Sequence, residues 1–201
     1  MYKTIPEAIE LVSGLKREFF KLDNQKIDIV LCPPFTALSE VSEVIVDSDI
    51  RLGAQDVHWQ EEGAFTGEVS LGMLKDAGCQ FVIIGHSERR QYFGETNESV
   101  NKKTKAALSG GLIPIVCVGE TLAQREASKA FEVLDDHIKN GLRGIGEEDI
   151  LKIVIAYEPV WAIGTGKTAT PQEAQEAQKY IRDLLKKEYN KDIANNIRIQ
   201  Y

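Results

Sequence analysis

The 201-residue sequence has no excess of positive charge and no long apolar run, and each shortage excludes a class of protein. It contains 24 lysines and arginines against 31 aspartates and glutamates, so a nucleic-acid binder with a basic face is not expected. No apolar stretch is long enough to cross a bilayer, and the first residues, MYKTIPEAIE, lack the segments of a signal peptide. We therefore expect a cytoplasmic protein that binds neither nucleic acid nor membrane.

Cysteine is also scarce. Cys32, Cys79 and Cys117 lie far apart, in or beside apolar segments, which indicates reduced core thiols rather than a disulfide framework. The three histidines show none of the close spacings of zinc ligands, so no metal site is predicted. With 43% hydrophobic and 27% charged residues, the chain is expected to fold as one domain over residues 1–201.

Short apolar segments rich in β-branched residues alternate with amphipathic segments of helical spacing. This alternation is typical of a parallel sheet with helical crossovers, either an open doubly wound sheet or a (β/α) barrel. Thr4 with Glu7, and Thr170 with Glu173, match the capping box that begins a helix. The predicted strands are 26–32, 49–54, 79–85, 112–119, 152–157 and 196–201. The predicted helices are 4–22, 35–47, 68–77, 96–109, 121–140 and 170–188.

Two residues that directly follow predicted strands carry the candidate chemistry, because sites in parallel α/β proteins form at the carboxyl ends of strands. His86 precedes SERR, which is expected to begin a short helix, and the positive end of that helix would favour a neutral imidazole able to polarise a carbonyl. Glu158 precedes a proline, where partial desolvation would raise its pKa towards that of a general base. A structural loop histidine and an exposed glutamate are the simpler interpretations.

The segment 159–169 has stiff or small residues at its ends and an apolar middle, as expected for a lid. Gly164 and Gly166 would let backbone N–H groups approach a phosphate. GTGKT is not a complete P-loop, because Trp161 stands where that motif needs glycine. The same glycines fit a dinucleotide fingerprint, so an NAD-dependent oxidoreductase is an alternative, although that motif should follow its strand at once.

The sequence contains, in this order, the motifs GAFTGE (63–68), IGHSERR (84–90), GETLAQRE (119–126) and AYEPVWAIGTGKTATPQE (156–173). These motifs occur in the same order in triosephosphate isomerases, and the sequence resembles that family over its whole length. The resemblance implies a (β/α)8 TIM barrel without a cofactor. It also implies the interconversion of dihydroxyacetone phosphate and D-glyceraldehyde 3-phosphate through an enediolate, in glycolysis and gluconeogenesis.

The resemblance further implies a role for each matching residue. Glu158 would be the base, His86 the electrophile and Glu88 a supporting carboxylate. Gly164 would bind the substrate phosphate from the lid, and Thr66 would lie near the tip of a loop that enters the neighbouring subunit of a homodimer. The lid and its hinges would contain Pro159, Val160, Trp161, Lys167, Thr168 and Ala169.

Compared with the family pattern, the chain is expected to be shortened at both ends. Met1 would stand just after an Asn-x-Lys on the family's first strand, and Tyr201 just before its Gly-Gly-Ser phosphate loop. We expect an incomplete barrel with about six strands of the eight. Because a cation and most phosphate contacts would be lacking, little or no isomerase activity is expected from the 201-residue chain alone. The alternative is a non-catalytic fragment, or a subunit completed by another chain.

Overall fold

The computed structural model describes residues 2–21 and 27–201, and the strands of this part of the chain form one parallel sheet. The strands pair in chain order, each parallel to the next. They are β1 (Ile29–Leu31), β2 (Ile50–Ala54), β3 (Phe81–Ile84), β4 (Ile113–Val118), β5 (Val154–Tyr157) and β6 (Arg198–Gln200). Each lies within a predicted strand, and the portions predicted over residues 22–26 lie outside the described residues.

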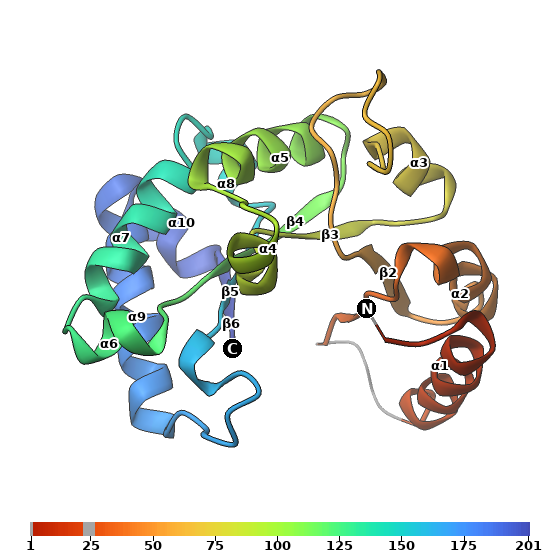
Figure 1. The fold of residues 1–201 in the computed structure, drawn as a ribbon, viewed down its shortest axis with the longest axis horizontal. Helices are drawn as coiled ribbons and strands as arrows, with labels where there is room; N and C mark the ends of the chain where they lie inside the picture. Colours follow the sequence, from red (N-terminus) through yellow and green to blue (C-terminus); the bar gives the residue numbers. More distant parts are fainter. Residues whose placement is uncertain (1, 22–26) are drawn as a thin grey trace.

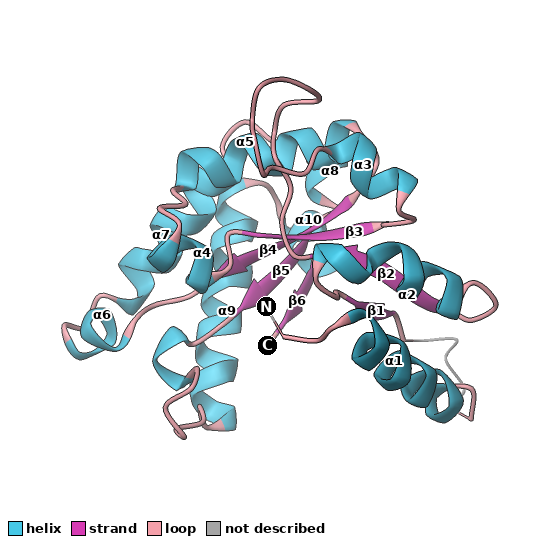
Figure 2. Cartoon of the chain, turned by 45° about the vertical axis from the view of Figure 1, so that its right-hand side comes forward, coloured by secondary structure: helices cyan, strands magenta, loops and turns pink. Residues whose placement is uncertain are grey.

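The helices cover the outer side of the sheet, which curls into a half-barrel (Figures 1 and 2). Figure 1 shows α1 and α2 at one end of the arc and α7 and α9 at the other. The helices are α1 (Ile5–Phe19), α2 (Leu38–Ile45), α3 (Leu71–Asp76), α4 (Ser87–Tyr92), α5 (Asn97–Ser109), α6 (Leu122–Glu126), α7 (Ala130–Gly141), α8 (Glu147–Ile150), α9 (Pro171–Glu188) and α10 (Lys191–Asn196), with short 3-10 helices η1 (Phe35–Ala37) and η2 (Val160–Ala162). This is the incomplete (β/α)8 barrel that the sequence predicts. None of the described helices has the length and apolarity to cross a membrane.

Local signals explain where several helices begin. Both predicted capping boxes are present, since the carboxylates of Glu7 and Glu173 accept the N–H groups of Thr4 and Thr170 at 2.7 and 2.8 Å. The prediction of one helix over 121–140 is wrong. The chain leaves α6 before reaching α7, and between them Ser128 adopts a left-handed φ of 58°, which cannot continue a right-handed helix.

Side chains alternate along each strand between the helix-covered face and the concave face. On β4, Val116 and Val118 pack in the main core beneath the helices, whereas Ile115 belongs to a smaller apolar cluster with Phe81 and Val154. Burying each aliphatic side chain of this size contributes about 1.5–3 kcal/mol, so the core holds the strand ends in register. Residues that follow neighbouring strands are therefore brought together at one end of the sheet.

Candidate active site

His86 and Glu158 meet at the carboxyl ends of the strands. His86 follows β3, Glu158 follows β5, and both strands pair with β4 between them. The Nε2 atom of His86 lies 3.3 Å from Oε2 of Glu158. Both residues line a cavity of about 660 Å³ on the concave side of the sheet. This volume is within the range of small-molecule sites.

The N-terminus of α4 holds the Glu158 carboxylate. Oε1 accepts the backbone N–H of Ser87 at 2.7 Å, and Oε2 accepts the Ser87 hydroxyl at 3.1 Å. Burial raises the pKa of Glu158, and this effect exceeds the opposing influence of His86, of the Ser87 hydrogen bonds and of Arg90. The direction agrees with the predicted desolvation. A partly buried carboxylate with a raised pKa is suited to accept a proton near neutral pH.

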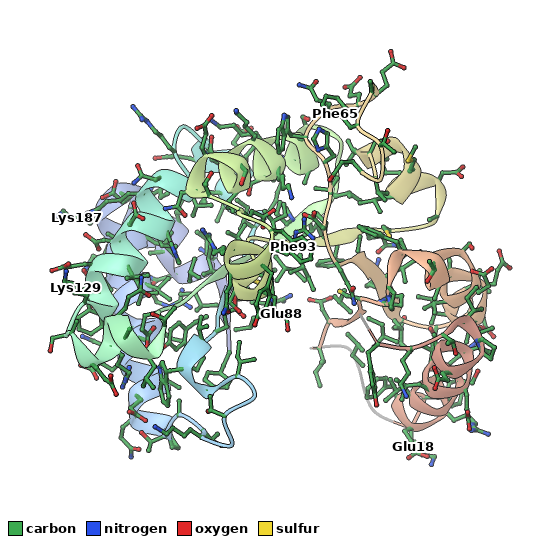
Figure 3. All side chains as sticks on the ribbon, in the orientation of Figure 1. Glu18, Phe65, Glu88, Phe93, Lys129 and Lys187 are labelled. Atoms are coloured by element: carbon green, nitrogen blue, oxygen red, sulfur yellow. The ribbon has the colours of Figure 1, made fainter. Side chains whose placement is uncertain are left out.

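His86 caps α4 through its imidazole, and this bond determines its tautomer. Nδ1 accepts the backbone N–H of Glu88 at 3.3 Å. In the neutral ring, an accepting Nδ1 leaves the proton on Nε2, the atom that faces Glu158. The Glu88 carboxylate is itself exposed, 3.7 Å from His86 Nδ1, and projects from α4 (Figure 3). His86 therefore presents a hydrogen-bond donor at the cavity.

Gly119 fixes the main chain at Glu158. A Cβ on Gly119 would lie 1.7 Å from the carbonyl oxygen of Glu158. Beside this contact, the Glu158 N–H donates to Val118 O at 2.9 Å, extending the pairing of β4 and β5 beyond the strands. Only a residue without a side chain fits between the two loops, so glycine sets the position from which the carboxylate reaches the cavity.

The predicted lid follows Glu158 directly, beginning with the buried Pro159 and η2. Trp161 is buried, whereas residues 163–168 are exposed. Gly164 and Gly166 have left-handed φ angles of 68° and 74°, which glycine adopts without strain. Val160 and Ala169 are partly buried, and the exposed residues at the far end are Lys167 and Thr168. The segment thus combines an anchored start with an exposed middle.

Glu120 anchors the start of the lid, and the sequence analysis missed it. Its carboxylate is buried and accepts the Trp161 Nε1–H at 2.8 Å and the Tyr157 hydroxyl at 3.2 Å. The main-chain N–H of Val160 also donates to Glu120 O at 3.1 Å. The signal was present, because Glu120 lies in the motif GETLAQRE directly after a predicted strand. Ser87 was also missed, and it lies inside the motif IGHSERR.

The loop that carries Thr66 extends away from the barrel. Thr66 is exposed, and so is its neighbour Phe65, which is labelled on this loop in Figure 3. At the base of the loop, the His58 ring stacks on Trp59 and contacts Phe65, with centroid separations of 4.3 and 4.4 Å. Aromatic packing within the loop therefore gives it a defined shape.

Comparison with known proteins identifies the family. The family model described as triosephosphate isomerase matches residues 1–201. The chain belongs to the triosephosphate isomerase family. The triosephosphate isomerases of Geobacter metallireducens, Thermoanaerobacter pseudethanolicus and Alkaliphilus oremlandii are 61%, 53% and 49% identical to it over 201 residues. These matches cover 100% of this chain and 79%, 80% and 80% of the relatives, so the chain spans about four fifths of the length of these triosephosphate isomerases. The resemblance noted in the sequence is confirmed.

Proposed function

We propose that the protein interconverts dihydroxyacetone phosphate and D-glyceraldehyde 3-phosphate, the activity that its family name describes, with Glu158 as the base and His86 as the electrophile. The observation that carries the proposal is the 3.3 Å approach of His86 Nε2 to Glu158 Oε2 in the cavity at the strand ends. A partly buried carboxylate beside a neutral N–H donor is the pair required to remove a proton next to a carbonyl.

In the proposed reaction, a Glu158 carboxylate oxygen takes a proton from the carbon adjacent to the substrate carbonyl. The electron pair of the broken C–H bond forms the enediolate, while the Nε2–H of His86 donates to the oxygen that gains charge. The oxygen that gained charge then takes up a proton from Nε2 of His86, and the ring regains one from the other oxygen, which becomes the new carbonyl as Glu158 returns its proton to the neighbouring carbon. Base and donor suffice for this sequence, so we propose that no cofactor takes part. In this proposal Glu88 supports the imidazole through its backbone N–H, which donates to Nδ1 and holds the ring.

The lid completes the site in this proposal. Gly164 would donate its backbone N–H to the substrate phosphate, because the left-handed backbone there leaves the N–H unobstructed by a side chain. The segment pivots at Pro159 to Trp161 and again at Lys167 to Ala169. A closed lid excludes water and keeps the enediolate from losing phosphate.

We further propose a cytoplasmic homodimer in which residues 1–201 act as one barrel domain. The support is the exposed loop around Thr66 together with two exposed aromatic residues at the end of α4, Tyr92 and Phe93, each 69% exposed. Large exposed apolar side chains beside one another are typical of protein interfaces. The loop of one subunit would cover such a surface on the other.

We propose that the 201-residue chain, assayed alone, isomerises triose phosphates slowly. Its described strands leave β1 and β6 as unpaired edges, and the cavity opens between them with Ile27 and Tyr201 on its border. Turnover within tenfold of that of the protein as its gene encodes it would refute this part of the proposal.

A coupled assay in both directions tests the function. The protein encoded by the complete gene should isomerise both triose phosphates without added cofactor. Glu158→Asp should lower kcat far more than it raises KM, because the shorter side chain withdraws the base from its proton. Absence of turnover would support the non-catalytic alternative, and an unchanged kcat in Glu158→Asp would remove the base from its role. Titration with NADH tests the oxidoreductase alternative.

A further inference from the structure

One arginine on α6 joins two carboxylates that hold the two ends of the segment 159–169. Arg125 donates from Nη1 to Glu120 Oε1 at 3.0 Å and from Nη2 to Glu173 Oε1 at 2.7 Å. Its guanidinium also lies over the Trp161 ring, with Cζ 4.8 Å from the ring centroid. Trp161 belongs to the start of the segment, Glu120 contacts that start from the loop after β4, and Glu173 lies beyond its end, in α9.

The two carboxylates that Arg125 joins are each tied to one hinge. Glu120 Oε1 accepts the Trp161 Nε1–H at 2.8 Å, so moving Glu120 moves the first hinge. Glu173 Oε2 accepts the N–H and the hydroxyl of Thr170 at 2.8 and 2.9 Å, so moving Glu173 moves the start of α9 and the second hinge. Glu173 binds Arg125 through Oε1 and Thr170 through Oε2, whereas Glu120 Oε1 accepts from both Arg125 and Trp161, so the guanidinium bridges the two carboxylates while both hinge bonds are present.

The chemistry of the bridge requires arginine. A guanidinium is a planar fork that can donate to two carboxylates at once while its face stacks on an aromatic ring. A lysine ammonium carries the same charge but is a single point on a flexible stem. The Glu120 side chain is only 1% exposed, so hydrogen-bond donors must replace the water that a carboxylate loses on burial. Arg125 is the cation among them.

We propose that Arg125 is a positioning residue that holds the two hinges of the lid at a fixed separation, so that the exposed residues between them close as one body. The proposal rests on the lid role in the proposed function. Arg125 acts through its hydrogen bonds to Glu120 and Glu173, and not through His86 or Glu158.

The side reaction of the proposed enediolate reports on the lid. When the lid fails to cover it, an electron pair on the C1 oxygen forms a C1–O double bond, the C1–C2 double-bond pair shifts to form a C2–C3 double bond, and the C3–O bond breaks. Inorganic phosphate leaves with the bonding pair. The remaining enol takes a proton at C3 and gives up its hydroxyl proton, which yields methylglyoxal. Loosened hinges should therefore raise the number of phosphate ions released per isomerisation.

The test compares Arg125→Lys and Glu173→Gln with Asp183→Asn in the protein as its gene encodes it. Glu173→Gln keeps an oxygen for the capping box but loses the ion pair. Asp183→Asn breaks the exposed 3.4 Å pair with Lys179 on the same helix, α9, and serves as the matched control. Two quantities are measured: amide hydrogen exchange over 160–169 without substrate, and phosphate released per isomerisation.

Exchange over 160–169 and phosphate release should both rise about threefold in Glu173→Gln, as for loss of a partly exposed ion pair. In Arg125→Lys they should rise about tenfold, because a bond to a buried charge is also lost. Neither should change in Asp183→Asn. The inference is overturned if amide exchange over 160–169 in Arg125→Lys and Glu173→Gln equals that of the control. It is also overturned if these variants isomerise the substrate and release no more phosphate per isomerisation than wild type. A wild-type protein without turnover refutes the proposed function instead, and the exchange measurement alone then decides the role of Arg125.

Discussion

Replacing Gly119 with alanine tests whether the main-chain position at Glu158 controls the site. The added Cβ would lie 1.7 Å from the Glu158 carbonyl oxygen, about half of an ordinary van der Waals separation. The obstructing atom is main chain, so no rotamer change relieves the contact, and Glu158 must shift by more than about 1 Å. A shift of that size costs on the order of 10²-fold in a reaction that depends on near-attack geometry. We expect Gly119→Ala to lower kcat/KM by at least about 100-fold.

Two controls separate this effect from a general loss of stability. A Cβ on Gly110 would also lie 1.7 Å from another atom, but that atom is Cδ2 of Leu71, a flexible side chain remote from the cavity. Gly14 lies within α1 with no atom within 4 Å of the new Cβ, so Gly14→Ala should stabilise the protein by about 1 kcal/mol. Both controls should retain kcat/KM in the coupled assay. A Gly119→Ala enzyme that folds and keeps more than a tenth of the wild-type kcat/KM would refute the reasoning.

Three further predictions concern buried titratable groups. Burial lowers the pKa of His137 from 6.5 to about 4, so between these values the unfolded chain binds a proton that the folded protein does not, and the free energy of unfolding should fall as pH drops. In urea titrations between pH 6 and 4, His137→Gln should lose less of this free energy than wild type, by about 1.4 kcal/mol per pH unit. The pKa of Glu158 is raised by burial, so its stabilising contribution is present below the unfolded value of 4.5 and is lost as pH rises. Glu158→Gln should thus unfold at higher urea than wild type at pH 8 and at a similar concentration at pH 3.5; equal midpoints at pH 8 would contradict this. Burial raises the pKa of Cys79, a side chain only 5% exposed, to about 11, so iodoacetamide at pH 8 should modify this thiol only at the rate of unfolding, and its rapid alkylation in the folded protein would contradict this.

The sequence predicts elements whose causes are local and misses contacts whose partners are distant. The six strands in the part of the chain that the structure describes were identifiable because each lies in a short apolar segment rich in β-branched residues. The starts of α1 and α9 were identifiable because their capping boxes span four residues. The break after α6 was missed, because Ser128 gives no strong local signal for a left-handed backbone. Ser87 is 71 residues from Glu158 along the chain, and only the folded sheet brings the hydroxyl to the carboxylate.

The site itself was predictable in part for the same reason. His86 and Glu158 each directly follow a strand, so their position at one end of a parallel sheet follows from topology. The hydrogen bond from Trp161 to Glu120 forms because the lid runs beside the loop after β4. Their proximity could not be predicted from the sequence alone. Arg125 is also a member of a recognised motif, yet its bridging role required the positions of α6 and α9.

His86 is both the N-cap of α4 and the hydrogen-bond donor of the site, so the stability of the helix and the reactivity of the site depend on the same side chain. Asparagine, aspartate and serine are the residues that begin helices best, and histidine is not among them. His86→Asn would offer α4 a stronger cap and would lack the Nε2–H that faces Glu158. Selection for a more heat-resistant protein and selection for a faster one would therefore favour different side chains here. A laboratory screen that scored only folding would be expected to enrich the version that no longer has the donor.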